Sequence, residues 1–375
     1  MFPLGGTKLS CNQGGCGACT CTMTTVNTAT GAAEYKAFNA CLRPLLAMDG
    51  MAVTTTEGIG NRDDGYHAVQ ERIADCNGSQ CGFCTPGQVM TLYSLLRERP
   101  GGDLGLEEIE ERFDGNICRC TGYRPIMTAA HTFAKEGCRD LTDIQGLPAT
   151  AFAAYSPASE PPPPAELAKM AWTRAAMKVS SPVDGTTWYR VVTIDELLKI
   201  RAQEPETKLV AGNTMTGPYG KDIRRRDCHS AAPPSTFSRC INSDEERTSA
   251  ERQSHQWLGK DDDTKVFIDI SSIPELSGVQ AANAAVTVGA ATTITALIQY
   301  LEANASKSAS FKTLVRHMKR VGNWQVRNVG SWAGNLVTVS GRRDCHFTDT
   351  PLFIPIETPT KGTGGVPSND GLADG

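Results

Sequence analysis

The sequence predicts a multidomain α+β chain in which a small cysteine-rich segment, a cysteine-rich helical domain and a larger α+β domain follow one another. Most of its 14 Cys residues lie before residue 140, in two sets with short spacers. A proline-rich stretch at 148–185 separates these sets from the remainder. Beyond it, short β-like stretches alternate with amphipathic helical ones, which predicts a mixed α+β domain.

The size, charge and cysteine content of the chain narrow its functional class. Its 375 residues suffice for two or three domains of roughly 100–200 residues each. A formal net charge of −4 indicates no nucleic-acid or anionic-membrane partner, and no apolar run reaches the ~18 residues of a membrane span. The first residues lack the basic and apolar regions of a signal peptide. Without an export signal, the many Cys residues favour reduced thiols and metal ligands over disulfides, so we expect a cytoplasmic protein.

The helical domain is expected around two close Cys pairs, Cys81–Cys84 and Cys118–Cys120. Between them, 88–99 and 106–113 have helical apolar spacing, and Pro86 suits the first turn of a helix. Two such helices would bring both pairs to a common end. Structural zinc and disulfides are the alternatives, but zinc pairs favour spacers of two to four residues and no secretory signal is present. An iron–sulfur cluster is therefore the preferred interpretation.

A second Cys set opens the chain, with Cys11, Cys16 and Cys19 followed at a distance by Cys41. Cys-x4-Cys-x2-Cys with a distant fourth Cys is the plant-type 2Fe-2S spacing. The intervening glycines would let backbone N–H groups approach the bridging sulfides. Cys21 is expected to be a small buried thiol and not a fifth ligand.

Both Cys sets, together with VTTTEG at 53–58, QCGFCTPG at 80–87 and GNICRCTGYRP at 115–125, resemble the xanthine dehydrogenase and aldehyde oxidase family. The resemblance is close over 5–140 and looser over 186–340. It implies a partial β-grasp, ferredoxin-like domain with one 2Fe-2S cluster and a four-helix domain with another. The implied ligands are Cys11, Cys16, Cys19 and Cys41 for the first cluster, and Cys81, Cys84, Cys118 and Cys120 for the second.

The first of these domains departs from the family pattern. Family members carry several strands before the first Cys loop, whereas this chain begins close before Cys11. Half of the ferredoxin sheet is therefore expected to be missing, and we expect the first cluster to be held less stably than the second. Asn12 and Gln13 replace a Gly-Glu pair in the loop, which is a milder change.

The third domain is expected after an extended, solvated proline-rich spacer, for which an SH3-type ligand is the rarer alternative. Thr193 to Glu196 form a capping box that opens a helix. Strand-to-turn junctions at 208–217 and 329–335 could hold a pyrophosphate through backbone N–H groups, although many junctions look alike. The resemblance implies an FAD-binding domain of the molybdenum hydroxylase flavoprotein type, in which a side chain at Gly212 would intrude on the phosphate and Val321 replaces an aromatic residue near the flavin. The implied FAD-binding residues are Leu209, Val210, Ala211, Gly212, Asn213, Thr214, Met215, Thr216, Ser331, Trp332, Ala333, Gly334 and Asn335, with Asp344 at the spacing of a further acid.

A charged segment at 220–263 fits no domain pattern and is expected to be a disordered insertion. Its Cys228, His229, Cys240 and His255 lack zinc-ligand spacing. The predicted layout is the partial ferredoxin-like domain at 1–57, the helical domain at 58–147, the linker at 148–185, the FAD-binding domain at 186–345 and a disordered tail at 346–375.

The resemblance implies an electron-transfer chain of two 2Fe-2S clusters and FAD. In the family, a molybdenum cofactor oxidises the substrate, and electrons then pass through the helical-domain cluster, the ferredoxin-like cluster and FAD to NAD+ or oxygen. The molybdenum domain is absent from this sequence, so a further domain or partner chain would hold it, and the full enzyme is expected to be a homodimer. We expect no catalytic residue here and no substrate hydroxylation by this chain alone. The alternatives are an aldehyde oxidase or carbon monoxide dehydrogenase-type component, and a non-catalytic, metal-binding product of a truncated gene, which would bind no FAD.

Overall fold

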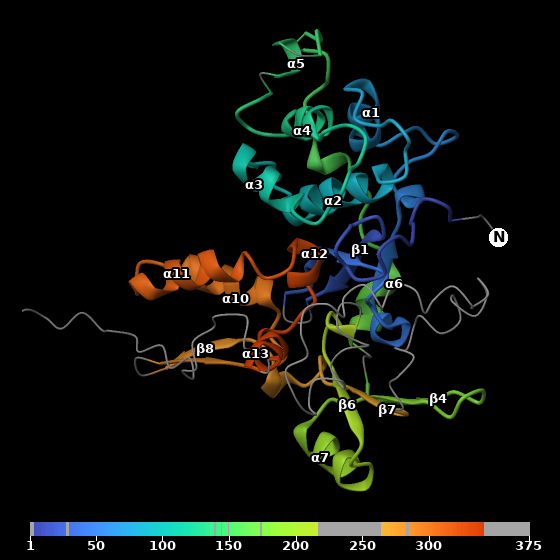
Figure 1. The fold of residues 1–375 in the computed structure, drawn as a ribbon, viewed down its shortest axis with the longest axis vertical. Coiled ribbons are helices and arrows are strands. Elements are labelled where there is room, and N and C mark those ends of the chain that lie inside the picture. The colour runs from blue at the N-terminus through green and yellow to red at the C-terminus, as the bar shows by residue number, and fades with distance from the viewer. Residues whose placement is uncertain are drawn as a thin grey trace, which may run out of the picture.

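The computed structural model describes residues 4–27, 30–138, 140–143, 145–148, 150–172, 175–216, 264–282 and 285–340 (Figure 1). The predicted insertion at 220–263, its Cys and His residues, the tail at 346–375 and Asp344 lie outside these residues. Within the described part, no helix is long and apolar enough to cross a membrane.

The N-terminal sheet has three antiparallel strands in the order β2-β1-β3. Its strands are β1 (Thr20–Val26), β2 (Ala33–Asn39) and β3 (Ala52–Thr54). Thr and Val dominate β1, as suits a pleated strand. In the β1–β2 register, Thr20 lies opposite Asn39. The loop before β1 and the turn after β2 therefore meet at one end of the sheet, which brings the segments that carry Cys19 and Cys41 together.

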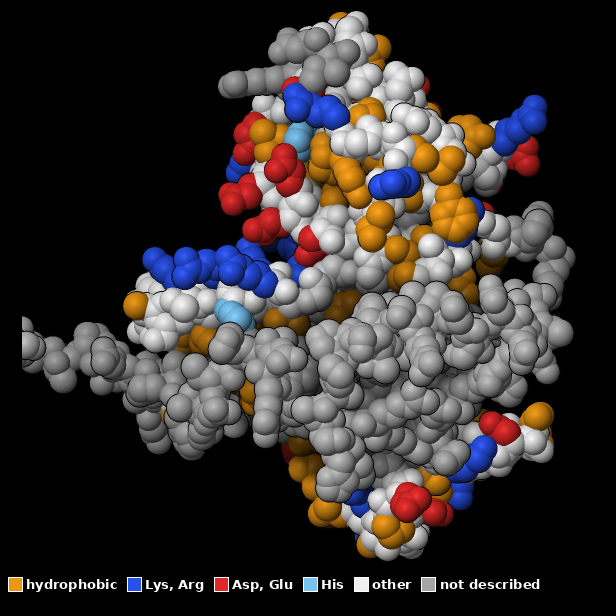
Figure 2. All heavy atoms as spheres, in the orientation of Figure 1, with side chains coloured by type: hydrophobic (Ala, Val, Ile, Leu, Met, Phe, Trp, Pro, Cys, Tyr) orange, Lys and Arg blue, Asp and Glu red, His pale blue; other side chains and the backbone are white. Residues whose placement is uncertain are grey.

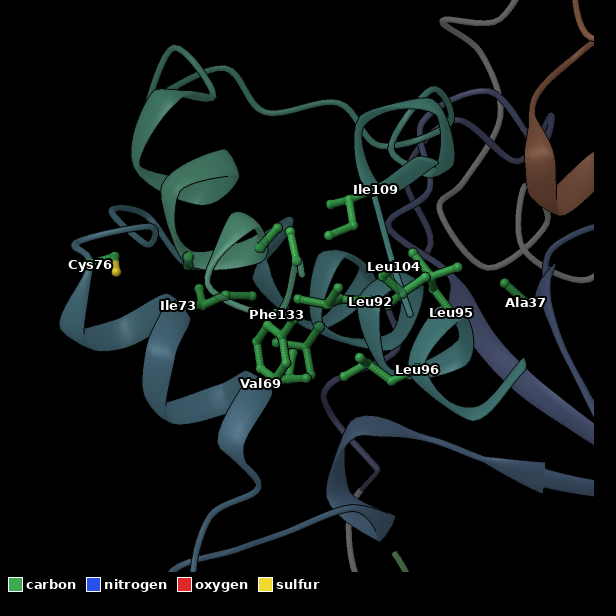
Figure 3. Close-up of a cluster of buried hydrophobic side chains, with 14 of the residues drawn as sticks. Ala37, Val69, Ile73, Cys76, Leu92, Leu95, Leu96, Leu104, Ile109 and Phe133 are labelled. Carbon is green, nitrogen blue, oxygen red and sulfur yellow. The ribbon is translucent and has the colours of Figure 1, made fainter. Parts of the chain in front are cut away.

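The helical domain is organised around one long central helix, α2. It comprises α1 (Ala68–Asp75), α2 (Thr85–Glu98), α3 (Leu106–Arg112), α4 (Arg124–His131) and the short α5 (Asp140–Asp143). The two helices predicted between the Cys pairs are confirmed as α2 and α3. Figure 3 shows Leu92, Leu95 and Leu96 of α2 among side chains of α1 and of the segments that follow α2. Each fully buried leucine contributes about 1.5–3 kcal/mol of hydrophobic stabilisation.

The proline-rich stretch is exposed over most of 150–164, but Glu160 anchors it to the helical domain. The Glu160 carboxylate accepts hydrogen bonds from Tyr155 (2.6 Å) and Arg97 (2.9 Å) and pairs with His67 Nε2 at 2.6 Å. Only 6% of the Glu160 side chain is exposed. After it comes α6 (Ala165–Trp172), which packs near β1. Glu160 thus ties an otherwise largely exposed stretch to the helical domain.

A four-stranded sheet in the order β4-β5-β7-β6 begins the third domain. Its strands are β4 (Met177–Ser180), β5 (Thr187–Arg190), β6 (Thr207–Val210) and β7 (Val266–Asp269), with α7 (Ile194–Gln203) between β5 and β6. β7 is parallel to β5 and β6, and β4 is antiparallel to β5. β4 falls inside the range predicted as linker. Thr193 caps α7 as the sequence predicts, by accepting a hydrogen bond from the Glu196 N–H.

The remaining elements form a hairpin and a group of helices. They are β8 (Val279–Ala282), β9 (Ala285–Val288), α10 (Ile294–Ala303), α11 (Ala309–Met318), α12 (Trp324–Arg327) and α13 (Trp332–Ser340). Figure 1 shows α12 where this group meets β1 and the helical domain. Figure 2 shows basic side chains gathered over α11, facing an acidic flank of the helical domain. Lys319 and Glu111 pair across this boundary at 2.9 Å.

Candidate iron–sulfur and flavin sites

The first predicted Cys set comes together at the end of the N-terminal sheet. Cys11 is hydrogen-bonded to Cys16, and Cys19 to Cys41. Cys41 also lies close enough to Cys11 for the two to interact electrostatically. The hydrogen bond from Cys41 lowers the pKa of Cys19 to about 7. The same interaction raises the pKa of Cys41, so the two thiols share one proton, and it is Cys19 that is disposed to the metal-binding thiolate form.

The loop that carries these thiols needs its glycines for different reasons. Gly14 (φ 72°) and Gly17 (φ 69°) adopt left-handed conformations that favour glycine. A Cβ at Gly17 would also lie 2.3 Å from the Gly115 carbonyl oxygen. The loop turns its Gln13 N–H toward the Cys11 sulfur at 3.4 Å. A hydrogen-bonded loop around thiols is what a cluster with inorganic sulfide requires.

Cys21 stands apart from the first set, as the sequence predicts. Its side chain is buried on β1 among Met23, Phe38 and Val329. Burial raises the pKa of the Cys21 thiol to about 11, against a weaker opposing effect of its contact with Thr7. A thiol of this kind is a packing group.

The second Cys set also comes together, between the starts of α2 and α4. Cys81 is hydrogen-bonded to Cys120, and Cys84 to Cys118. Cys84 is the residue that precedes α2, and α4 begins just after the Cys118–Cys120 pair. Cys118 is buried, whereas Cys81 and Cys120 are exposed. This second group therefore opens to solvent on one side.

Local hydrogen bonds shape the Cys118 turn. The Cys118 N–H donates to the Tyr123 hydroxyl (3.0 Å), and the Thr121 N–H donates to the Cys118 sulfur (3.4 Å). Tyr123 has a φ of 70°, which is rare for a bulky residue and is held here by its own hydroxyl contact. Burial alone would raise the pKa of Cys118, but the hydrogen bonds from Thr121 outweigh it and lower the pKa. The turn thus favours the thiolate form.

The thiols of both groups come as pairs. Among the described residues, no three His, Cys, Asp or Glu side chains converge as a single metal ion would require. Two pairs of thiols per group instead suit a centre with two irons, because each iron takes two thiolates in a 2Fe-2S cluster. The donor chemistry of each group therefore fits the predicted cluster.

One hydrogen bond joins the two groups. The Ile117 N–H, next to Cys118, donates to the Cys16 carbonyl oxygen at 3.0 Å. The backbones approach closely around it, since a Cβ at Gly87 would lie 2.1 Å from the Gly17 carbonyl oxygen. The second cluster site is thus in backbone contact with the first.

The two predicted flavin turns also adjoin. The turn at 211–216 follows β6 and packs against the segment that leads into α13. A Cβ at Gly212 would lie 2.1 Å from the Val329 carbonyl oxygen and 2.8 Å from the Gly330 Cα. Gly212 therefore allows the two turns to meet, whereas the sequence interpretation had a side chain there meeting a phosphate.

The turn after β6 is tied to the first cluster site. The Asn213 side-chain amide donates to the Leu42 carbonyl oxygen (2.8 Å), and Arg43 donates to the Ala211 carbonyl oxygen (2.9 Å). The Asn213 amide oxygen also accepts a hydrogen bond from the Thr216 hydroxyl at 2.6 Å. Asn213 therefore bridges two modules, a role that its sequence position did not reveal. Its left-handed φ of 59° is the local signal of a constrained position.

The other predicted turn is the start of α13. The Ser331 hydroxyl accepts a hydrogen bond from the Gly334 N–H at 3.2 Å. The Trp332 indole donates to the Gly289 carbonyl oxygen at 2.8 Å, so this side chain packs within the protein. At the backbone, the Trp332 N–H donates to the Thr292 carbonyl oxygen at 3.1 Å, so this helix start is bonded to the segment before α10. The two turns at which the sequence expects the phosphates of FAD therefore lie against each other.

Comparison with known proteins supports both kinds of site. Residues 55–131 match the family model of a [2Fe-2S] binding domain, and residues 253–350 match an FAD binding domain in molybdopterin dehydrogenase. A xanthine dehydrogenase from Calliphora vicina is 34% identical over 364 residues, covering 89% of this chain and 24% of the relative. Aldehyde oxidase 4 from Mus musculus is 33% identical over 362 residues, with the same coverage of 89% and 24%. The chain is similar to the iron–sulfur and FAD-binding part of the xanthine dehydrogenase and aldehyde oxidase family.

The chain spans about a quarter of the length of these family members. The second Cys group and the start of α13 lie within the two matched ranges, while the first Cys group and the turn at 211–216 lie outside them. Among solved structures, quinoline 2-oxidoreductase from Pseudomonas putida 86 is 34% identical, with a TM-score of 0.28, and covers 34% of this chain and 70% of that one. The family assignment rests on the sequence matches.

Proposed function

We propose that this chain is the electron-transfer part of a xanthine dehydrogenase-like molybdenum hydroxylase. Cys81, Cys84, Cys118 and Cys120 hold one 2Fe-2S cluster, Cys11, Cys16, Cys19 and Cys41 hold the other, and the turns at 209–216 and 331–335 hold FAD. When bound, the clusters carry single electrons and FAD collects two. The molybdenum centre belongs to a further domain or a partner chain.

The single observation that carries this proposal is the order in which the three sites contact one another. The Ile117 N–H next to Cys118 reaches Cys16 in the first group, and Leu42 next to Cys41 reaches Asn213 in the flavin turn. The first group therefore lies between the second group and the flavin turns. This order supports electron flow from the helical-domain cluster through the first cluster to FAD.

The surface around the second Cys group, at the end of this series farthest from the flavin turns, suits the docking of another domain. Cys81 and Cys120 are exposed, and large apolar side chains beside them are exposed as well, at 45% for Phe83, 56% for Ile117 and 40% for Tyr123. Apolar groups gathered on a surface mark interaction sites. The proposed electron donor, the molybdenum domain, docks on this face.

The proposal includes the acceptor and the assembly. NAD+ or oxygen takes the electrons from FAD, and the full enzyme is a homodimer, both in keeping with the family. The relatives include xanthine dehydrogenases and aldehyde oxidases, so a purine or an aldehyde is the substrate class at the molybdenum centre.

Stepwise reduction of the reconstituted chain tests the proposal. The protein is loaded with iron, sulfide and FAD and reduced anaerobically, while the cluster signals are followed by electron paramagnetic resonance and the flavin by absorbance. We expect two distinct 2Fe-2S signals and a flavin that is reduced through them. Cys41→Ser should remove one signal and slow flavin reduction, and Cys118→Ser should remove the other. A protein that binds no FAD would favour the non-catalytic, metal-binding alternative.

A further inference from the structure

The loop of the first cluster site is held by a residue from the flavin domain. The Gly14 carbonyl oxygen accepts hydrogen bonds from two side-chain amides, Asn39 Nδ2 at 3.1 Å and Asn323 Nδ2 at 2.7 Å. Asn39 ends β2, whereas Asn323 precedes α12 and lies 309 residues after Gly14. Both side chains are buried, with 3% and 5% of their surface exposed.

These two amides determine which way the next peptide N–H points. In a planar trans peptide, the Gly14 carbonyl and the Gly15 N–H point in opposite directions. With the Gly14 oxygen held by Asn39 and Asn323, the Gly15 N–H turns to the thiol side of the loop. There the Gln13 N–H donates to the Cys11 sulfur at 3.4 Å, and the Gly15 N–H lies close enough to the same sulfur to stabilise its thiolate. We call the Asn39 and Asn323 donors to the Gly14 oxygen the amide clamp. The clamp and the N–H donors near the Cys11 sulfur therefore depend on the same orientation of the Gly14–Gly15 peptide.

Asn323 is fixed from several directions. Its Oδ1 accepts the Val326 N–H at 3.0 Å and so caps α12. The next residue, Trp324, donates its N–H to Asp114 Oδ1 at 2.8 Å, and Arg327 pairs with Asp114 Oδ2 at 2.7 Å. Asp114 belongs to the helical domain, just before the Cys118 turn. The Asn323 amide is therefore unable to swing away from Gly14 without breaking these contacts.

Apolar side chains lie close around Gly14 in the loop of the first cluster site. A Cβ at Gly14 would lie 2.4 Å from Leu42 Cδ1 and 3.4 Å from Val326 Cγ2. α12 thus supplies both a hydrogen-bond donor and an apolar contact to the cluster loop. Figure 1 shows α12 close to the N-terminal sheet, which it contacts through β2.

We propose that Asn323 is a positioning residue for the first iron–sulfur cluster, and that by orienting the Gly14–Gly15 peptide it raises the reduction potential of that cluster. The inference rests on the proposed function, because it requires a cluster at Cys11, Cys16, Cys19 and Cys41. Reduction adds negative charge to the cluster and its sulfurs. N–H donors aimed at the sulfurs stabilise that charge, and such hydrogen bonds are among the factors that set cluster potentials. A loop without the clamp lets the Gly15 N–H turn away, and the cluster becomes harder to reduce.

Two variants separate the donor from the helix cap. Asn323→Asp keeps the shape and the Oδ1 acceptor that caps α12, but it has no N–H to donate to Gly14. Asn323→Ser also keeps a capping acceptor and adds no charge. The matched control is Ser308→Ala, which removes the cap of α11, where the Ser308 hydroxyl accepts the Ser310 N–H. That control leaves Gly14 untouched.

The measurement is a redox titration of the full chain, reconstituted with iron and sulfide and followed by electron paramagnetic resonance. We expect the midpoint potential of the first cluster to become more negative in Asn323→Ser and more negative still in Asn323→Asp, where a carboxylate faces the Gly14 carbonyl. The second cluster should keep its potential in both variants, and Ser308→Ala should change neither.

Three results would overturn the proposal. They are an unchanged first-cluster potential in both Asn323 variants, equal shifts of both clusters, and an equal shift in Ser308→Ala. If Asn323→Asp fails to keep the first cluster, Asn323→Ser decides by the same criteria, and loss of both clusters from both variants counts against the proposal. A wild-type chain with no first-cluster signal would instead refute the proposed function, so the two failures are distinguishable.

Discussion

Replacing Gly212 by Ala tests whether the two flavin turns must meet for FAD to bind. The new Cβ would lie 2.1 Å from the Val329 carbonyl oxygen, 2.5 Å from its carbonyl carbon and 2.8 Å from the Gly330 Cα. All three are backbone atoms, so no flexible side chain can move aside. Gly212 has no left-handed φ, and the close approach is therefore the whole cost of the substitution.

The expected size of the effect follows from this overlap. Forcing a methyl group into a packed position costs about 1–3 kcal/mol. The chain relieves it by moving the turn at 211–216 away from Val329, and FAD must then bring the turn back. Since about 1.4 kcal/mol changes affinity tenfold, we expect the dissociation constant for FAD to rise by roughly 5- to 150-fold.

Titration of the apo-flavin protein with FAD, followed by quenching of flavin fluorescence, measures this change. Gly101→Ala is the matched control, because a Cβ there meets no atom within 4 Å and Gly101 has no left-handed φ. The control should bind FAD like the wild type. Wild-type affinity in Gly212→Ala would refute the assignment of these turns to FAD, whereas weakened binding in Gly101→Ala would show that the assay reports general destabilisation.

Three further predictions follow from the sites and their supports. Replacing Cys81, Cys84, Cys118 or Cys120 singly by Ser should remove one 2Fe-2S signal and about half of the bound iron, and unchanged iron in all four variants would refute the ligand assignment. Cys81 and Cys120 are exposed while Cys19 is buried, so a chelator with a mild oxidant should remove the helical-domain cluster first. This order is the reverse of the one expected from the sequence. Electron paramagnetic resonance measures the loss of each cluster, and simultaneous loss of both would contradict the prediction. Burial opposes ionisation of Glu160, but hydrogen bonds from His67, Tyr155 and Arg97 outweigh burial and lower the pKa of Glu160 from 4.5 to about 2. The ionised carboxylate therefore stabilises the fold above pH 4.5, and this stabilisation is lost as the pH falls toward 2. Glu160→Gln should therefore destabilise the chain by about 1–2 kcal/mol at pH 7, with a difference from wild type that shrinks below pH 4.5 in urea unfolding, and a constant difference would argue against it.

Local signals in the sequence predict the helical domain well. The apolar stripe of Val89, Leu92, Leu95 and Leu96, with Pro86 at the start, predicts α2 because helix periodicity is set by neighbouring residues. The short spacers likewise predict which four Cys residues gather at this site, although the thiols that interact are Cys81 with Cys120 and Cys84 with Cys118, across the two spacers and not within them. The plant-type spacing groups Cys41 with the first loop but does not place it, because its position depends on the register between β1 and β2.

Contacts between distant segments escape such reasoning. The proline run before Ala165 has the local preference of an extended spacer, yet Glu160 is held by His67 and Arg97, which lie 93 and 63 residues earlier. Asn213 reads as a phosphate-binding residue in its turn, yet its amide reaches Leu42, 171 residues away. No periodicity in the sequence records partners at such separations.

Backbone proximity explains why the modules of this chain meet where they do. Electron transfer weakens steeply with distance, so cluster and flavin sites must lie close, and side chains at the boundaries would hold them apart. At two of these boundaries the structure has glycine where a Cβ would overlap a carbonyl oxygen at 2.1 Å, namely Gly87 against Gly17 and Gly212 against Val329. The first joins the two thiol groups, and the second joins the two flavin turns beside the first group. Each glycine allows backbone atoms to touch across a boundary, and the hydrogen bonds from Ile117 to Cys16 and from Asn213 to Leu42 lie in the same two regions. The close placement of the three sites is therefore a property of backbone packing, which is why we expect substitutions at these glycines to disturb electron transfer more than substitutions of the exposed side chains around them.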